Sequence, residues 1–147
     1  MKLLYVASDQ RVPGSTGGSV HVEEVARGLT ALGHDVHVMA LPGKAPTDLK
    51  LYPSPVLIEH RLFRWTAQRG VVRLLEELSI DAVIERYYNF GGEGIRGAYE
   101  RAIPSLLEVN SPLVERSGSL KDVLDRVALF RPMERLRREI CKKATAL

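Results

Sequence analysis

The chain has 147 residues, 45% of them hydrophobic and 27% charged, which is the composition of an ordinary soluble globular domain with a core of its own. The net charge of +3 is too small to indicate a nucleic-acid-binding protein. A single cysteine, Cys141, excludes an internal disulfide framework and favours a reducing compartment. No apolar stretch approaches the roughly 20 residues of a membrane span, and no signal-peptide cleavage site follows the N-terminal MKLLYVAS. We therefore expect a cytoplasmic protein.

The N-terminal segment is predicted to form a strand, a glycine-rich loop, a helix and a second strand. Residues 2–7 are an apolar run without alternation, which indicates a strand covered on both faces. Apolar residues recur at helical spacing over 22–32, and Ser19 is the expected N-cap of that helix. Residues 35–41 form the second strand, so the unit is a right-handed βαβ crossover.

The rest of the chain continues this alternation. Residues 42–55 contain four prolines and are predicted to be a loop. Further strands are expected at 56–59, 82–84 and 105–109, with helices at 66–78 and 95–102 and a last helix, from 119, that Pro132 divides before 133–143. The pattern predicts an α/β fold, a Rossmann-like open parallel sheet with helices on both faces. Ligands of such sheets bind beyond the carboxyl ends of the strands, which selects loops 8–19, 85–92 and 110–116.

The first of these loops contains GSTGGS at residues 14–19. Glycines at a helix N-terminus let backbone N–H groups approach an anion, so the loop suits a phosphate or a diphosphate. A P-loop would need a lysine where Ser19 and Val20 stand, and an NAD fingerprint would need G-x-G-x-x-G with an acidic residue after the second strand. Neither pattern is present. The remaining alternative is that the glycines only shape a turn.

Three stretches of the chain resemble the N-terminal half of a GT-B glycosyltransferase, of the glycosyltransferase family 4 type. They are GGSVHVEEVARGLTALGHDVHV, DAVIERYYNFGGEG and IPSLLEVNSPLVE, and they occur in the order and at the spacing of that family. The second resembles the family's D-V-I-x-x-R-Y strand end, and the third its fifth strand with an E-V-N-x-P-L ending.

The resemblance implies a hexosyltransferase-type enzyme that moves a sugar from a nucleotide-sugar donor to a saccharide or lipid-linked acceptor, as in polysaccharide biosynthesis. It implies retention of anomeric configuration, with the nucleotide sugar as a substrate and neither a metal nor a cofactor. A C-terminal domain would hold the donor nucleotide, while the N-terminal domain receives the acceptor. Its first glycine loop would face the donor diphosphate, through Gly17, Gly18 and Ser19.

Residues in or beside these loops are expected to bind substrate, with His21 in the first turn of the helix that follows the first loop: His21, Glu85, Arg86, Tyr87, Asn110 and Glu115. Asn110 stands where many members of the family have a histidine that contacts the donor sugar, and an amide cannot titrate. No residue of the chain is a convincing nucleophile, so the sequence identifies no catalytic residue.

Structural alternatives stand beside these roles. Glu85 and Arg86 can form a local ion pair that orients the loop, while Tyr87 can belong to the core and Glu115 can be a solvated acid. The lone His21 can equally have a packed or solvated role. Glu108 is expected to point away from Asn110, because side chains of a strand alternate.

The basic segment over 131–143 has two interpretations. Its arginines and lysines can contact anionic lipid at the inner membrane face, which suits a lipid-linked acceptor. Alternatively, it is a solvated helix that covers the sheet, with Glu134 and Glu139 as ion-pair partners, and we favour this interpretation.

Residues 1–147 are expected to form one acceptor-side domain, with the nucleotide-binding C-terminal domain absent, and to be inactive alone. An exposed sheet edge would then invite homodimerisation. The alternative function is that of a non-catalytic α/β module that binds a phosphorylated small molecule.

Overall fold

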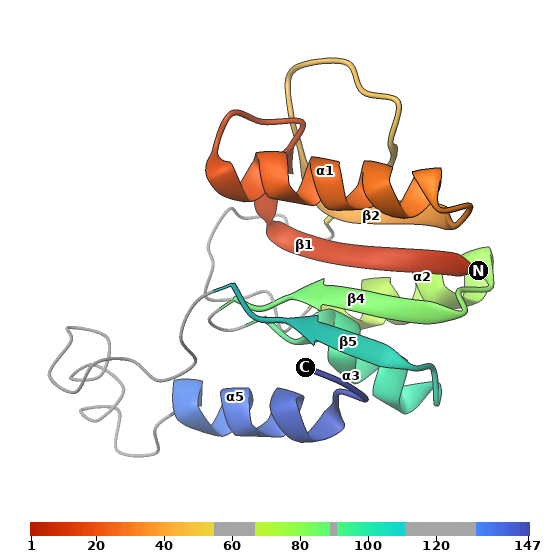
Figure 1. The fold of residues 1–147 in the computed structure, drawn as a ribbon. Helices are drawn as coiled ribbons and strands as arrows, with labels where there is room; N and C mark the ends of the chain where they lie inside the picture. The colour runs from red at the N-terminus through yellow and green to blue at the C-terminus, as the bar shows by residue number, and fades with distance from the viewer. Residues whose placement is uncertain (55–66, 89–90, 111–131) are drawn as a thin grey trace, which may run out of the picture.

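The computed structural model describes residues 1–54, 67–88, 91–110 and 132–147, which form a parallel sheet flanked by helices (Figure 1). The elements are β1 (Lys2–Val12), α1 (Gly17–Ala31), β2 (Asp35–Pro42), β3 (Lys50–Pro53), α2 (Gln68–Leu78), β4 (Ala82–Arg86), α3 (Glu93–Glu100), β5 (Ser105–Glu108) and α5 (Pro132–Lys143). The strand order is β3-β2-β1-β4-β5, and every neighbouring pair is parallel. The predicted Rossmann-like fold class is confirmed.

Helices cover both faces of the sheet, because successive side chains of the buried strands point to opposite sides. Tyr5 belongs to the cluster that packs against α1, together with Val22. Its neighbour Leu4 belongs to the cluster under α2 and α3, together with Val71. All four side chains are completely buried, so the sheet is the centre of the core.

From β1 the chain adds β2 and β3 on one side of the sheet and then β4 and β5 on the other side. The strand order therefore reverses between β1 and β4. In open α/β sheets the crossover helices leave in opposite directions at such a point, which opens a crevice beyond the carboxyl ends of the strands. The carboxyl ends of β1, β4 and β5 and the start of α1 lie on the same side of the sheet, as Figure 1 shows.

The first strand is longer than predicted and is interrupted by a bulge. Ala7 pairs with Ala40, and Arg11 pairs with the next residue of β2, Leu41, so residues 8–10 have no counterpart in that strand. A bulge of this kind redirects the side chains that it contains. It therefore turns Asp9, at the carboxyl end of β1, away from the regular ladder and towards β4.

The third strand lies inside the segment predicted to be a loop. Residues 50–53 pair in parallel with β2, with Pro53 opposite Ala40. Proline is tolerated here because β3 is an edge strand, where an N–H group on the outer side has no partner to lose. The strand expected at 56–59 lies outside the described residues.

Two details of the predicted helices are wrong. Helix α1 begins at Gly17, and its N-cap is Thr16, whose hydroxyl accepts a hydrogen bond from the backbone N–H of Ser19. The helix expected at 95–102 is α3, which begins at Glu93 and ends at Glu100; Ile95 and Ala98 face the core, whereas Tyr99 is 61% exposed.

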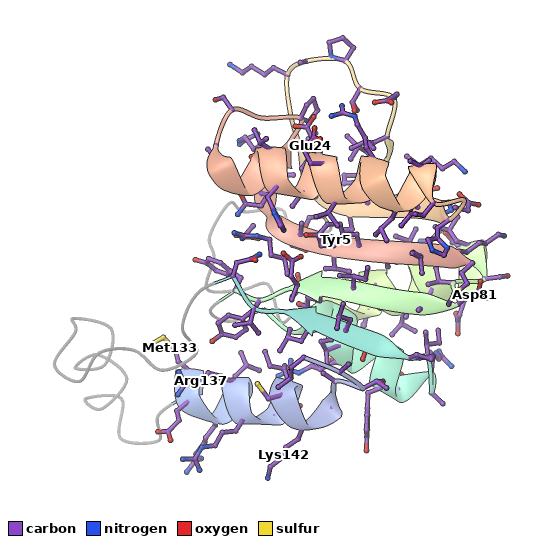
Figure 2. The ribbon with its side chains drawn as sticks, viewed as in Figure 1. Tyr5, Glu24, Asp81, Met133, Arg137 and Lys142 are labelled. Carbon is purple, nitrogen blue, oxygen red and sulfur yellow. The ribbon has the colours of Figure 1, made fainter. Side chains whose placement is uncertain are left out.

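Helix α5 packs beside α3 and β5 through Ile140, Ile95 and Leu107. Its glutamates pair with its basic residues, Glu134 with Arg138 and Glu139 with Lys143, so the ion pairs of the solvated-helix interpretation are confirmed. Lys142 projects away from the sheet (Figure 2). Contact of this helix with a membrane stays a prediction.

The outer edge of β5 is partly paired, contrary to the expected open edge. Ala146 forms a parallel bridge with Leu106, and the Leu107 N–H donates to the Ala146 carbonyl over 3.0 Å. Homodimerisation through an edge also stays a prediction.

Candidate functional site

The carboxylate of Glu108, at the end of β5, joins three segments of the chain. It accepts hydrogen bonds from the Tyr5 hydroxyl of β1 and the His21 Nε2 of α1. The Asn110 side-chain amide donates to it as well, over 2.6 Å. Glu108 was predicted to point away from Asn110. That prediction is wrong because the strand ends at Glu108, so the alternation of side chains does not extend to Asn110.

The surroundings of Glu108 keep it ionised. Its partial burial would raise the pKa, but the hydrogen bonds from Tyr5, Asn110 and His21 outweigh this and hold the pKa of Glu108 below its ordinary value. Burial, with the neighbouring carboxylate, raises the pKa of Tyr5. Tyr5 therefore remains a hydrogen-bond donor to Glu108, from its place between β1 and α1 (Figure 2).

A second polar contact joins β1 and β4 at the switch point, the place where the strand order reverses. Arg86, the last residue of β4, reaches Asp9 in the bulge of β1, with 3.0 Å between Nη1 and Oδ2. Both side chains are largely buried, with 17% and 5% exposed. The partner of Arg86 is therefore Asp9 and not the adjacent Glu85, because neighbouring residues of a strand point to opposite faces.

Glu85 is buried and supports the site from beneath. Its two carboxylate oxygens accept backbone N–H groups at the start of α3, from Gly92 over 2.6 Å and from Ile95 over 2.7 Å. Burial, and the charge of the nearby Glu93, raise the pKa of Glu85. The prediction that Glu85 binds substrate is corrected, because its carboxylate faces the inside of the protein and is already satisfied.

The glycine loop lies at the carboxyl-end rim of the sheet, the side at which β1, β4 and β5 end. Gly17 is exposed, and a side chain added there would meet nothing within 4 Å. Gly18 is backed by the Gln10 side chain. Within the described part of the chain, the N–H groups of Gly17 and Gly18 donate to no acceptor, as expected for the first residues of a helix.

Ser19, by contrast, is only 1% exposed. Its N–H donates to the Thr16 hydroxyl, and its own hydroxyl lies 2.7 Å from that of Thr16. The prediction that Ser19 binds the diphosphate is therefore corrected, because the residue completes the helix cap instead.

The remaining predicted residues divide into three groups. His21 and Asn110 are brought together on Glu108. Tyr87 is half-buried and packs against the cluster of Ile95, Leu107 and Ile140, so it belongs partly to the core. Glu115 lies outside the described residues.

Sequence reasoning missed Tyr5, Asp9 and Glu108. One signal could have found Tyr5: a tyrosine within a fully apolar strand needs a partner for its hydroxyl. Asp9 lies in the first loop that the carboxyl-end rule selects, but its direction depends on the bulge.

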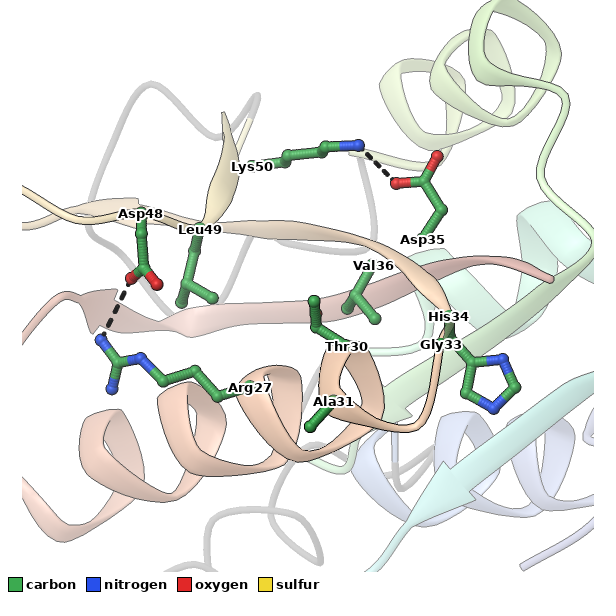
Figure 3. Close-up of a pocket in the computed structure, with 10 residues that line it drawn as sticks. All are labelled: Arg27, Thr30, Ala31, Gly33, His34, Asp35, Val36, Asp48, Leu49 and Lys50. Atoms are coloured by element: carbon green, nitrogen blue, oxygen red, sulfur yellow. Dashed lines mark hydrogen bonds and ion pairs between the residues drawn. The ribbon is translucent and has the colours of Figure 1, made fainter.

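A hollow lies elsewhere, where α1 ends and β2 and β3 begin (Figure 3). It measures about 710 Å³. Its charges are paired with one another, Lys50 with Asp35 over 2.5 Å and Arg27 with Asp48 over 3.4 Å. This amino-end groove is on the wrong side of the sheet for a ligand of an open α/β fold.

Among the described residues, no three or more histidine, cysteine, aspartate or glutamate side chains gather in a way that could hold a metal ion. In the same part of the chain, no helix is long and apolar enough to cross a membrane.

Solved structures with the same fold include several glycosyltransferases. Acinetobacter baumannii MurG matches 98% of this chain at a TM-score of 0.61 and 16% identity, and the match covers 39% of MurG. Streptomyces sp. SF2575 glycosyltransferase SsfS6, complexed with thymidine diphosphate, matches 79% of the chain at a TM-score of 0.51 and 18% identity, over 40% of its own length. A UGT transferase from Siraitia grosvenorii, in complex with UDP, matches 86% at a TM-score of 0.51 and 19% identity, over 28% of its length.

The chain thus spans about two fifths or less of these neighbours. A comparison with curated proteins gave no significant match. The sequence profile of Glycosyltransferase Family 4 matches residues 15–146, from the glycine loop to the residues that pair with β5. With this match over nearly the whole chain and the Rossmann-like sheet shared with GT-B enzymes, the protein belongs to glycosyltransferase family 4.

Proposed function

We propose that the protein transfers a sugar from a nucleotide-sugar donor to a saccharide or lipid-linked acceptor, with retention of anomeric configuration. The observation that carries this proposal is the pair of free backbone N–H groups of Gly17 and Gly18, on the rim that also holds His21 and Asn110. The reaction site is then the crevice between β1 and β4.

The chemistry of that rim suits the leaving group of glycosyl transfer. When the bond between the sugar and the diphosphate breaks, negative charge develops on the diphosphate. Two free N–H groups and the positive end of the α1 dipole are aligned before the reaction, so they stabilise this charge without reorganising. The Arg86 guanidinium adds positive charge at the switch point, where Asp9 fixes its position.

Two comparisons support the donor class. The family match indicates glycosyl transfer, and two of the structural neighbours hold thymidine diphosphate or UDP. Both bound molecules are nucleoside diphosphates, which are the products left after a nucleotide sugar has given up its sugar. A non-catalytic module that binds a phosphorylated small molecule would use the same N–H groups but release no nucleotide.

The test is turnover of the natural full-length protein on a panel of UDP-, GDP-, ADP- and TDP-sugars with saccharide and lipid-linked acceptors. The wild type should release nucleoside diphosphate in step with a glycosylated product of retained configuration. Gly17→Asp should lower the turnover at least tenfold, because it places a carboxylate where the diphosphate binds.

The matched control is Gly28→Asp, on the same helix, where an added side chain also meets nothing within 4 Å. It should keep wild-type turnover, and thermal unfolding checks that both variants fold. Equal activity of the two variants would contradict the proposed diphosphate site. Ligand binding without any transfer would instead favour the non-catalytic module.

A further inference from the structure

The Gln10 side chain joins the Asp9–Arg86 pair to the glycine loop. Gln10 lies in the bulge of β1, next to Asp9, and is half-buried. Its Nε2 donates to Asp9 Oδ2, the same oxygen that accepts a hydrogen bond from Arg86 Nη1. Because an ionised carboxylate only accepts hydrogen bonds, the –NH₂ group of Gln10 must face Asp9, and its Oε1 points the other way.

The other end of the same amide lies against the start of α1. The hydroxyl of Thr16, which caps the helix, is 3.5 Å from Gln10 Oε1. A Cβ atom added to Gly18 would lie 2.7 Å from Gln10 Cδ and closer still to Oε1, which is nearer than non-bonded atoms pack. The Gln10 amide therefore occupies the space that any side chain at position 18 would need.

A comparison within α1 shows that this close packing is specific to Gly18. A Cβ atom added to Gly17 or to Gly28, the other two glycines of the helix, would meet nothing within 4 Å. Gln10 cannot swing away from Gly18 without giving up its hydrogen bond to Asp9. The place of the first backbone N–H groups of α1 is thus coupled to that of the Arg86 guanidinium, although β4 and α1 are far apart in the sequence.

We propose that Gln10 is a positioning residue for donor binding: it fixes the Arg86 guanidinium relative to the free N–H groups at the start of α1, so that both act on one diphosphate. Gln10 acts through Asp9 and Gly18 and needs no contact with the donor itself. The inference rests on the proposed function and names the residue that assembles its diphosphate site.

Replacement of the amide tests this link. Gln10→Met keeps an unbranched side chain against Gly18 but removes both polar contacts. With the best donor and acceptor of the panel, it should raise the donor KM about tenfold and leave the acceptor KM unchanged, because only the groups that bind the diphosphate lose their alignment. The matched control is Gln68→Met, which likewise takes a side-chain amide from a carboxylate, that of Glu100, between α2 and α3. The control should behave as wild type, and thermal unfolding checks the fold of each variant.

A double substitution separates the role of Gln10 from a direct need for glycine at position 18. In the wild type, Gly18→Ala should raise the donor KM about tenfold, because the added methyl group displaces Gln10 from Asp9. In the Gln10→Ala background the same substitution should have no further effect, since its space is then vacant. Gly28→Ala is the control in both backgrounds. An equal loss in both backgrounds would contradict the inference, because the diphosphate itself would then exclude the methyl group.

Binding of inorganic pyrophosphate tests the inference without turnover. In ¹⁵N-glycine-labelled protein, the amide signals of Gly17 and Gly18 should shift together on titration, and Gln10→Met should need about tenfold more pyrophosphate for half saturation. An unchanged pyrophosphate affinity or an unchanged donor KM of Gln10→Met would overturn the inference, and the proposed function stands in either case if transfer is observed. Absence of transfer from every donor would overturn the proposed function and the inference together.

Discussion

The two ends of the sheet differ in how their polar groups are arranged. At the carboxyl end, Glu108 and the Asp9–Arg86 pair are partly or largely buried, and they link segments far apart in the sequence. At the amino end, Lys50 pairs with Asp35 and Arg27 with Asp48 in an open groove (Figure 3). The groove is therefore at the end with the more exposed ion pairs.

The presence of a hollow does not by itself identify a ligand site. Exposed ion pairs contribute little to stability and hold nothing in a fixed geometry. Buried polar groups are costly unless each is satisfied, so a set of them that converges on one rim must be held rigidly. Variants at the two ends should accordingly differ in both stability and function.

The largest effect on stability is expected at the buried carboxylate beneath the carboxyl-end rim. Glu85→Ala should lower the free energy of unfolding by about 3 kcal/mol, because it leaves two buried backbone N–H groups without an acceptor. Chemical denaturation measures this, with Glu77→Ala on the exposed side of α2 as control. Equal stability of the two variants would show that Glu85 does not hold the start of α3.

The pair at the switch point should have the next largest effect. Arg86→Ala should cost about 2 kcal/mol, less than for a fully buried pair, because part of the Arg86 side chain reaches solvent. It should also weaken donor binding, since a positive charge is lost beside the proposed diphosphate site. Denaturation and the donor KM are the two measurements, and a loss of stability with an unchanged KM would restrict Arg86 to a structural role.

The two carboxylates at neighbouring strand ends should respond to pH in opposite directions. Folding raises the pKa of Glu85, so its contribution to stability is present below the ordinary value of about 4.3 and is lost as the pH rises through the raised pKa. Folding lowers the pKa of Glu108, so its contribution is present above about 4.3 and is lost as the pH falls through the lowered pKa.

Denaturation at several pH values compares the wild type with Glu85→Gln and with Glu108→Gln. The stability difference from Glu85→Gln should shrink as the pH rises, and that from Glu108→Gln should shrink as the pH falls. Parallel profiles would contradict the opposite directions in which folding shifts the pKa values of Glu85 and Glu108.

The smallest effect is expected at the amino end. Lys50→Ala removes an exposed partner of Asp35 and should change neither the unfolding midpoint nor transfer. Lost transfer in this variant would assign a functional role to the amino-end groove and remove the distinction between the two ends.

Much of the fold follows from local patterns in the sequence. Apolar runs and glycine stops correctly indicate β1, β2 and β4 and the helices between them, because these elements are buried on predictable faces. Strand β3 was missed since its stability depends on pairing with β2, and an edge position tolerates Pro53.

The site was only partly predictable. The carboxyl-end rule selected the loop that contains Asn110 and the loop that leads into α1, where His21 lies. Their common partner Glu108 was assigned the wrong direction, because the alternation rule does not say where a strand ends. The alternative in which Arg86 pairs with its sequence neighbour is wrong, because its partner Asp9 is 77 residues away and is directed by a bulge that no local pattern indicates.

The most direct test compares glycines at both ends of the molecule. In ¹⁵N-glycine-labelled protein, addition of UDP-glucose or inorganic pyrophosphate should shift the amide signals of Gly17 and Gly18, whose N–H groups are free. Gly33, which lines the amino-end groove, should stay unchanged. A shift of Gly33 without one of Gly17 or Gly18 would contradict the account and place the anion at the opposite end of the sheet.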